Sequence, residues 1–406
     1  MKIEPIGIGI IGCGAITRAY FPTLNEKISH VKIIGVADLI PEKAQAAAEK
    51  LHTAAMTNEE IYNHPDIQIV VNLTNVWSHY EVIKAALEHG KHVYCEKMMA
   101  ETFEKGKELY DLAKEKGLRY SVAPDTFLGA GMQTCRKYID DGLIGTPLSV
   151  QVTVVKDLYP NRPDDVRMNT DNNGGTIPFD MGGYYLHGMQ LMFGPVKRVA
   201  GFTRHLKKRW SNPASPKYGE EVVLESPNFV QVALEFESGV LGSFTAVDAC
   251  IRDSNVNGFY VYGTDGILFC PDPNTFMGPV KLLRKGSGEY MELPLTHGYS
   301  TVEWNPFAPP ITDFRLKPNY RGIGVADMAW AITNNRPQRI SNEMGLHAIE
   351  IIHGAEESCR TGKTYEMTTH PKRPVALRPG FVGIDAEDVF NDYFDEDTDT
   401  TPPWAW

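Results

Sequence analysis

Three side chains that could move a proton lie at helical spacing in the middle of the chain. Asp180, Tyr184 and His187 stand at positions i, i+4 and i+7, which face the same way on a helix. Oxidation of a hydroxyl needs a group that removes its proton. A free imidazole has a pKa of about 6.5, whereas a free phenol has a pKa of about 10 and needs a nearby cation to act as a base. The segment therefore provides two candidate bases and one orienting carboxylate, with half-buried helix residues as the structural alternative.

A glycine-rich turn near the N-terminus has the composition of a pyrophosphate site. Residues 12–17 read GCGAIT, directly after the apolar run 6–11 and at the start of a helical stretch. Gly12 permits the tight turn, and Gly14 lets the backbone approach an anion at the helix N-terminus. Thr17 stands where a third glycine is expected for helix packing. A strand–helix turn without a ligand is the alternative interpretation.

An acidic residue follows at the spacing typical of a dinucleotide site. Asp38 ends the next apolar run, near the spacing of about 20 residues at which a carboxylate holds the ribose 2′-hydroxyl. The residues between Asp38 and Lys43 include no Arg or Lys that could receive a 2′-phosphate. We therefore predict NAD rather than NADP as the cofactor. A helix N-cap role for Asp38 is compatible with this interpretation.

The elements that must position these residues begin with a series of short apolar runs. They span residues 6–11, 32–37, 67–73, 91–95 and 119–123. Runs this short and this apolar suit strands that are buried on both faces. Strands that alternate with helices indicate a parallel, doubly wound sheet.

The helical stretches between these strands carry recognisable end signals. Pro41 suits a first turn, and Thr57–Glu60 and Ser78–Glu81 have the spacing of a capping box. Gly90 and Gly117 suit the position just past a helix end.

The pattern changes after residue 147 to alternating, β-branched segments separated by turns. Predicted strands span 148–155, 229–236, 240–247, 259–262, 267–269, 280–283 and 290–293, and predicted helices span 324–333 and 343–359. We therefore predict an α/β protein. A Rossmann domain occupies residues 1–125, an α+β domain with a large open, mostly antiparallel sheet occupies 126–365, and a tail occupies 366–406.

Composition excludes several classes of protein. The chain has 406 residues, 42% of them hydrophobic and 22% charged, which is typical of globular proteins. A net charge of −11 disfavours nucleic acid as a partner. The sequence also lacks the run of about 18 apolar residues that a membrane-spanning helix needs. The six cysteines are dispersed and form no CxxC pair, which predicts reduced thiols. The sequence shows no signal-peptide pattern, so we expect a cytoplasmic location.

The C-terminal tail carries most of the excess negative charge. After Arg378 the chain has eight Asp and Glu residues but no Lys or Arg. The tail also contains the aromatic residues Phe390, Tyr393, Phe394, Trp404 and Trp406. A solvated tail and a tail docked on the body or on a neighbouring subunit are both open at this point.

Four segments together resemble a known family. They are Asn72-Leu73-Thr74 with Ser78-His79, residues 90–97 (GKHVYCEK), Gly174-Gly175 before residues 180–184 (DMGGY), and residues 341–363. These motifs are similar to those of the glucose–fructose oxidoreductase, inositol dehydrogenase and rhizopine-catabolism (Gfo/Idh/MocA) family. The resemblance covers roughly residues 6–365.

The resemblance implies roles for particular residues. Lys97 corresponds to the lysine that reaches both the nicotinamide ribose and the reacting oxygen, and a lysine at the carboxyl end of a parallel strand is well placed for this. Met98 replaces a proline that shapes the following backbone in the family. Tyr184 replaces a histidine and is the implied acid/base. Asp125 and Thr126 stand where many relatives carry an arginine pair, so a strongly anionic substrate is disfavoured.

The motifs and the resemblance together define three sets of candidate residues. The catalytic set is Lys97, Asp180, Tyr184 and His187. The cofactor set is Gly12, Gly14, Ala15, Ile16, Asp38, Leu73, Thr74, Asn75, His79, Glu96 and Lys97. The substrate set is Lys97, Tyr159, Arg162, Asn172, Asp180 and Tyr184. No metal site is predicted.

The resemblance implies an NAD-dependent oxidoreductase that takes a hydride from a secondary hydroxyl of a sugar, polyol or glycoside and gives a keto-sugar. One alternative is an NAD-dependent glycosidase, in which transient ring oxidation permits elimination of an aglycone. Another is a sensor that binds NAD or sugar, although Lys97 weighs against it. We also expect a homo-oligomer formed through the C-terminal sheet.

Overall fold

The computed structural model describes residues 4–155, 176–209, 213, 216, 218–222, 227–247, 258–300, 319–380 and 394–406, without the side chains of residues 208, 209 and 222. Within these ranges no helix is long and apolar enough to cross a membrane. No group of three or more His, Cys, Asp and Glu side chains in the same ranges could hold a metal ion. The five cysteines described there are free thiols.

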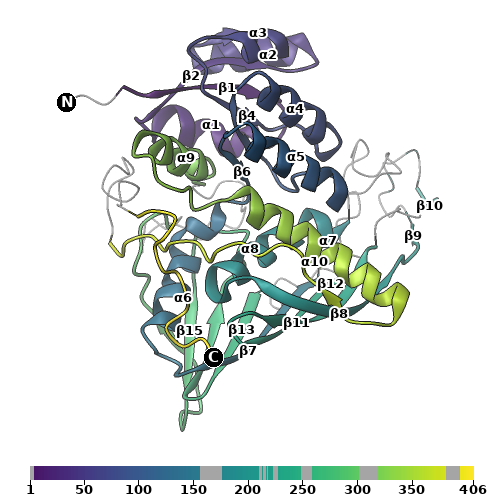
Figure 1. The fold of residues 1–406 in the computed structure, drawn as a ribbon, viewed down its shortest axis with the longest axis vertical. Helices are drawn as coiled ribbons and strands as arrows, with labels where there is room; N and C mark the ends of the chain where they lie inside the picture. Colours follow the sequence, from purple (N-terminus) through teal and green to yellow (C-terminus); the bar gives the residue numbers. More distant parts are fainter. Residues whose placement is uncertain are drawn as a thin grey trace.

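The N-terminal part of the chain forms a six-stranded parallel sheet (Figure 1). Its strands are β1 (Ile6–Ile11), β2 (Val31–Ala37), β3 (Ala54–Ala55), β4 (Ile69–Asn72), β5 (His92–Cys95) and β6 (Tyr120–Val122), in the order β3-β2-β1-β4-β5-β6. The five predicted strands are confirmed. β3 was not predicted because it is a pair of exposed alanines without an apolar run. The order reverses between β1 and β4, which is where ligands bind beside the carboxyl ends of strands in such sheets.

Five helices connect these strands: α1 (Thr17–Glu26), α2 (Pro41–Leu51), α3 (Asn58–Asn63), α4 (Val76–Glu88) and α5 (Phe103–Glu115). The capping box at Thr57 and Glu60 is confirmed, with both reciprocal hydrogen bonds present. Gly90 and Gly117 follow helix ends with positive φ angles, as predicted. Such a backbone is accessible to glycine at little cost.

The predicted capping box at Ser78 and Glu81 is wrong. α4 begins at Val76, with Asn75 at its N-cap position. The side-chain oxygen of Asn72 accepts hydrogen bonds from the backbone N–H and the hydroxyl of Thr74, at 3.1 and 2.7 Å. This side-chain turn ends β4 and lets the helix begin before Ser78.

The second part of the chain forms a nine-stranded mixed sheet. Its strands are β7 (Pro147–Val155), β8 (Val196–Arg204), β11 (Phe229–Phe236), β12 (Leu241–Val247), β13 (Gly258–Gly263), β14 (Gly266–Cys270), β15 (Val280–Arg284), β16 (Met291–Leu293) and β17 (Tyr365–Glu366). Their order is β16-β15-β14-β13-β7-β12-β11-β8-β17, and every pairing is antiparallel except that of β12 with β7. The predicted α+β architecture is confirmed. The short strands β9 (Lys208–Arg209) and β10 (Glu221–Val222) pair separately.

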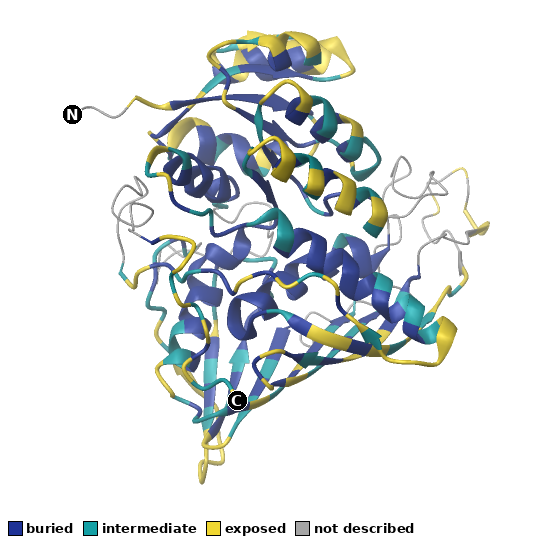
Figure 2. Cartoon of the chain, in the orientation of Figure 1, coloured by how far each residue is buried: buried dark blue, intermediate teal, exposed yellow. Residues whose placement is uncertain are grey.

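Helices cover one face of this sheet and connect it to the first. They are η1 (Thr126–Leu128), α6 (Ala130–Asp140), α7 (Ile177–Asp180), α8 (Gly182–Phe193), α9 (Ile323–Thr333) and α10 (Asn342–Thr361). Every residue of α8 is buried, and α10 contacts both β8 and α5 (Figure 2). α9 reaches the first domain, where the rings of Trp330 and His30 stack with their centroids 3.8 Å apart. The core is therefore continuous between the two sheets.

The outer face of the nine-stranded sheet is exposed. Burial alternates along β11, as expected for a sheet with one covered face. Phe202 on β8 and Leu241 on β12, the two strands that flank β11, expose 69% and 58% of their surface. Assembly of a homo-oligomer through this sheet stays a prediction, as do the domain boundaries at residues 125 and 365.

The described part of the tail, residues 394–406, is docked on the body. The ring of Phe394 is buried against Arg336 and Arg339, with their Cζ atoms 4.7 and 4.9 Å from its centroid. Both guanidinium groups bind the buried carboxylate of Asp327 at 2.8 Å. Trp404 packs edge-on against Phe193. Of the two alternatives for the tail, docking on the body therefore holds for this segment.

Replacing Phe394 with alanine is expected to lower the free energy of unfolding by about 3 kcal/mol. The substitution leaves a cavity and uncovers a buried ion cluster. Urea unfolding followed by circular dichroism measures this change. Trp406→Ala is the matched control, because this side chain is 76% exposed and its loss should cost less than about 1 kcal/mol. Equal losses in the two variants would show that docking of Phe394 does not stabilise the fold.

Candidate active site

The glycine turn after β1 fits closely against the strand beside it. Gly12 has a φ of +100°, and a Cβ at this position would lie 2.7 Å from the backbone of Leu73 and Thr74. Only glycine fits there without displacing the loop after β4. A Cβ on Gly14 would meet nothing within 4 Å, so open space lies over the turn. A pyrophosphate could approach the N-terminus of α1 through this space.

Thr17 takes the place of the third glycine and closes the turn. Its hydroxyl donates a hydrogen bond to the carbonyl oxygen of Gly14 at 2.7 Å, and the side chain is buried. Ala15 and Ile16 lie between these two residues at the start of α1, where the predicted cofactor set places them. The larger residue is therefore accommodated, and the turn remains suitable for an anion.

Asp38 connects the glycine turn to the start of α2. Its carboxylate accepts hydrogen bonds from the backbone N–H groups of Cys13 and Ile40, at 2.8 and 2.9 Å. The N-cap residue of α2 is Ile40, so the N-cap interpretation of Asp38 is wrong. Leu39 and Ile40 beside the carboxylate expose 87% and 45% of their surface. Exposed apolar side chains next to a carboxylate suit an adenosine, whose base is flat and whose ribose carries hydroxyl groups.

Asp38→Ala is expected to reduce the preference for NAD over NADP at least tenfold, as a ratio of kcat/KM values. The variant loses a hydrogen-bond acceptor for the ribose and a charge that repels a 2′-phosphate. Steady-state kinetics with both cofactors measures the ratio. Glu42→Ala, on the first turn of α2, is the control for loss of an acid nearby. A wild-type enzyme that prefers NADP would contradict the assignment.

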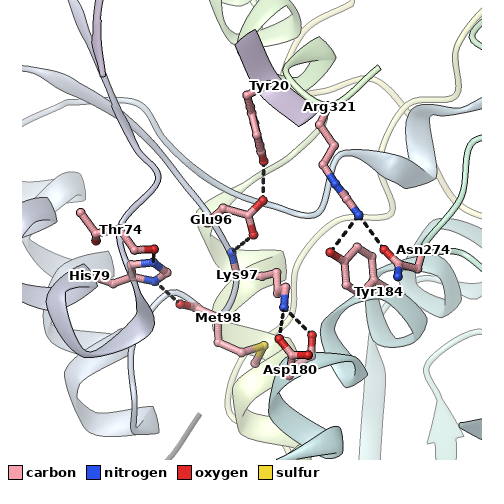
Figure 3. A network of polar contacts seen from close by, with 10 residues as sticks. All are labelled: Tyr20, Thr74, His79, Glu96, Lys97, Met98, Asp180, Tyr184, Asn274 and Arg321. Atoms are coloured by element: carbon pink, nitrogen blue, oxygen red, sulfur yellow. Dashed lines mark hydrogen bonds and ion pairs between the residues drawn. The ribbon is translucent and has the colours of Figure 1, made fainter. Parts of the chain in front are cut away.

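His79 is buried and connects the loop after β4 to the loop after β5. Its Nδ1 is 2.7 Å from the carbonyl oxygen of Met98, and its Nε2 is 3.2 Å from that of Thr74 (Figure 3). Burial lowers the pKa of His79, so the ring is neutral at pH 7 and carries a single N–H. The shorter contact favours the tautomer in which Nδ1 donates to the carbonyl oxygen of Met98. The Lys97–Met98 peptide bond is cis, although the family's proline is absent.

Glu96 holds the end of β5 close to α1. The hydroxyl of Tyr20, on α1, donates a hydrogen bond to Glu96 at 2.7 Å, and the backbone N–H of Lys97 donates to the same carboxylate at 3.1 Å. Glu96 is buried. The carboxylate therefore fixes the backbone from which the Lys97 side chain extends (Figure 3).

Lys97 joins the two domains through Asp180. Its Nζ donates hydrogen bonds to the carboxylate of Asp180 at 2.7 Å and to the backbone oxygen of the same residue at 2.5 Å. Burial disfavours the charged amine, but the electrostatic influence of Asp180, Tyr184 and Glu96 and the hydrogen bond to Asp180 outweigh it and raise the pKa of Lys97. Lys97 is therefore a cation at neutral pH, which can donate hydrogen bonds and stabilise negative charge.

Tyr184 lies beside this ion pair and also contacts a second cation, the guanidinium group of Arg321. Its ring centroid is 5.3 Å from the Nζ of Lys97, and its oxygen accepts a hydrogen bond from Arg321 Nη2 at 3.0 Å. Burial raises the pKa of Tyr184, whereas the charges of Arg321 and Lys97 act in the opposite direction. The structure thus brings together three predicted catalytic residues, Lys97, Asp180 and Tyr184.

Arg321 was missed by the sequence analysis. It precedes α9 and lies 137 residues from Tyr184 along the chain, so no local spacing connects the two. Its guanidinium also donates to Asn274 at 2.6 Å. The carboxylate of Asp125 accepts the backbone N–H groups of Gly322 and Gly324, which holds this loop in place. The only sequence signal was a lone arginine before a glycine and an apolar helix.

His187 is placed deeper in the fold than the other three. Its ring stacks on Phe127, and its Nδ1 is 2.8 Å from the carbonyl oxygen of Gly183 in the preceding turn. Burial lowers the pKa of His187 to about 4. The structure does not bring its ring into hydrogen-bond contact with Lys97, Asp180 or Tyr184, and its role as a base stays a prediction.

The remaining predicted residues have different places. Leu73 is buried behind the glycine turn, and Asn75 is the N-cap residue of α4. Tyr159, Arg162 and Asn172 lie outside the described residues, so their role in substrate binding stays a prediction.

Two family models match the chain. One, described as "Oxidoreductase family, NAD-binding Rossmann fold", matches residues 6–124, and the other, described as "GFO/IDH/MocA C-terminal domain", matches residues 132–269. The chain belongs to the GFO/IDH/MocA oxidoreductase family. The predicted family and the predicted cofactor are thereby confirmed: this family member carries an NAD-binding Rossmann domain.

Named relatives of this GFO/IDH/MocA chain act on polyols and sugars. The inositol 2-dehydrogenase/D-chiro-inositol 3-dehydrogenase of Lactiplantibacillus plantarum is 31% identical over 39% of this chain and 47% of its own length. The levoglucosan dehydrogenase of Pseudarthrobacter phenanthrenivorans is 28% identical over 66% of this chain and 73% of its own. The match thus spans about half of the first relative.

A solved structure shares the fold. The crystal structure of an NAD binding oxidoreductase from Klebsiella pneumoniae superposes with a TM-score of 0.75 over 90% of this chain and 100% of that chain, at 23% identity.

Proposed function

We propose that this chain is an NAD-dependent dehydrogenase that oxidises a secondary hydroxyl of a sugar, polyol or glycoside to a ketone. The observation that carries the proposal is the ion pair of Lys97 and Asp180 beside the buried phenol of Tyr184. Lys97 extends from the carboxyl end of β5, and the other two residues come from α7 and α8 of the second domain. A cation, its counter-ion and an acid/base group thus meet beside the carboxyl ends of the strands in the six-stranded sheet.

Each of the three residues has a separate task in the proposed reaction. NAD, when bound, accepts the hydride from the carbinol carbon. The ammonium group of Lys97 stabilises the negative charge that develops on the substrate oxygen as its proton leaves. Asp180 orients Lys97 through the 2.7 Å contact, and Tyr184 takes the hydroxyl proton.

The relatives and the charges near Tyr184 support the proposed substrate class. Both named relatives are dehydrogenases of cyclic, hydroxyl-rich compounds. Arg321 is a cation at the site, but its guanidinium is already bound to Tyr184 and Asn274. An uncharged sugar, polyol or glycoside therefore fits the site better than a sugar phosphate.

The test of this proposal is NADH formation with a panel of free sugars, polyols, acidic sugars and aryl glycosides. NADH absorbance and the keto product are measured together. The proposal predicts at least one neutral compound that gives NADH and ketone in equal amounts. Aglycone release without net NADH would instead support the glycosidase, and tight binding of NAD and sugar without turnover would support the sensor.

A further inference from the structure

Arg321 has a direct contact with the proposed acid/base group. One of its N–H groups, on Nη2, lies 3.0 Å from the oxygen of Tyr184, and its Cζ lies 5.3 Å from the centroid of the same ring (Figure 3). Asn274 accepts a second hydrogen bond at 2.6 Å, and the Arg321 side chain is buried. The guanidinium is therefore held against the phenol oxygen from a loop that is itself fixed by Asp125.

We infer that Arg321 is the positioning residue that holds Tyr184 and favours its ionised form. A hydrogen bond from a cation stabilises an anionic oxygen more than a neutral one. The inference deepens the proposed function and rests on it, because it concerns the group that takes the proton.

Arg321 is better suited to this role than Lys97. The ammonium charge of Lys97 is compensated by the carboxylate of Asp180 at 2.7 Å. Among the described residues, Arg321 donates its hydrogen bonds to two uncharged groups, Tyr184 and Asn274, and forms no ion pair. Its charge therefore acts on the phenol with less compensation. Arginine also keeps its proton throughout the pH range of catalysis.

The charged groups that face Tyr184 come from three segments: Glu96 and Lys97 after β5, Asp180 on α7, and Arg321 before α9. Burial raises the pKa of Tyr184, Glu96 and Asp180 act in the same direction, and Arg321 and Lys97 oppose them.

Two further groups, Tyr20 and Asp125, face Arg321 itself. Burial raises the pKa of Asp125 to about 6, so this carboxylate is ionised at the alkaline pH where a phenol titrates. Loss of Arg321 therefore removes a cation from a site that keeps its anions, and the pKa of Tyr184 must rise.

The proton balance of the step is simple. In the oxidation, the substrate O–H bond breaks and its proton forms a new O–H bond with the phenolate of Tyr184. The hydride leaves the adjoining carbon and reduces NAD, so the alcohol becomes a ketone. Tyr184 ends as a neutral phenol and must lose its proton before the next turnover, which Arg321 makes easier.

The test follows the ionisation of Tyr184 in the NAD-bound protein without any substrate. Tyrosine carrying carbon-13 at ring Cζ is incorporated, and the Tyr184 resonance is assigned by its absence in Tyr184→Phe. The resonance is followed from neutral to alkaline pH in wild type, Arg321→Met and Arg321→Lys. We expect the resonance to move toward its phenolate position at the lowest pH in wild type, at a higher pH in Arg321→Lys, and at the highest in Arg321→Met.

A matched control separates this effect from general charge loss. Lys27 lies over the ring of Tyr320, next to Arg321, with its Nζ 4.5 Å from the ring centroid. Lys27→Met should leave the Tyr184 titration unchanged, and NAD affinity reports whether each variant is folded. Identical pH titrations of the Tyr184 resonance in wild type and Arg321→Met would overturn the inference. A Tyr184 resonance that does not move with pH in wild type or in either Arg321 variant would also overturn it.

The pH dependence of turnover on a panel substrate gives the second readout. Arg321→Met should lower kcat/KM about tenfold or more at neutral pH. The kcat/KM of the variant should approach that of wild type as the pH rises, because the phenolate of Tyr184 then forms without the charge of Arg321. A purely structural role would lower the rate equally at every pH and overturn the inference. If the resonance shifts as expected but no panel compound reduces NAD, the proposed function fails and the assignment of Arg321 stands.

Discussion

Replacing Lys97 with alanine is expected to lower kcat by about three orders of magnitude while the dissociation constant for NAD changes little. Its ammonium group is the donor assigned to the oxygen that becomes negative as the reaction proceeds, and such a donor acts mainly in the transition state. Turnover of a panel substrate and fluorescence titration with NADH measure the two quantities separately.

The same variant removes the ammonium group that binds Asp180, so a loss of stability must be separated from a loss of chemistry. Thermal unfolding shows whether Lys97→Ala is folded at the assay temperature. Lys84→Ala is the matched control, because Lys84 forms an exposed ion pair with Glu108 on the neighbouring helix. Turnover near the wild-type rate in a folded Lys97→Ala protein would refute the assigned role.

Tyr184→Phe is expected to abolish turnover, whereas His187→Ala should retain most of it per folded molecule. The phenylalanine keeps the ring next to Lys97 and removes only the oxygen that takes the proton. Kinetics of both single variants on one substrate, with NAD affinity as a measure of folding, give the comparison.

The pH profile distinguishes the two bases independently of the variants. Burial lowers the pKa of His187 to about 4, so this imidazole is unprotonated at neutral pH and would be fully active as a base above about pH 5. A phenol instead requires rising pH to ionise, so the rate of oxidation should increase through the alkaline range. A rate that is flat above pH 5 and lost in His187→Ala would assign the base to His187.

The sheets were predictable because their signals are local. Each strand of the first domain except β3 is a short, largely apolar and mostly buried run, and each hairpin of the second has a turn between alternating segments. The failures were also local. β3 has no apolar run, and the turn made by the side chain of Asn72 starts α4 before the residue that the capping-box pattern selected.

The site was predictable only in part, because a helical period does not show which side of a buried helix faces a ligand. All twelve residues of α8 are buried, so the spacing of Tyr184 and His187 could not separate a residue near Lys97 from one packed on Phe127. Arg321 is brought to Tyr184 by tertiary folding across 137 residues, which no motif or period records.

Deuterium transfer tests the central claim most directly. A substrate that reduces NAD in the panel is prepared with deuterium on the carbinol carbon, and the cofactor and the sugar are analysed by mass spectrometry after turnover. We expect one deuterium in each reduced nicotinamide for each ketone formed, and no such transfer with Tyr184→Phe. Deuterium that remains in the sugar or passes to solvent while the cofactor is reduced would contradict direct hydride transfer at this site.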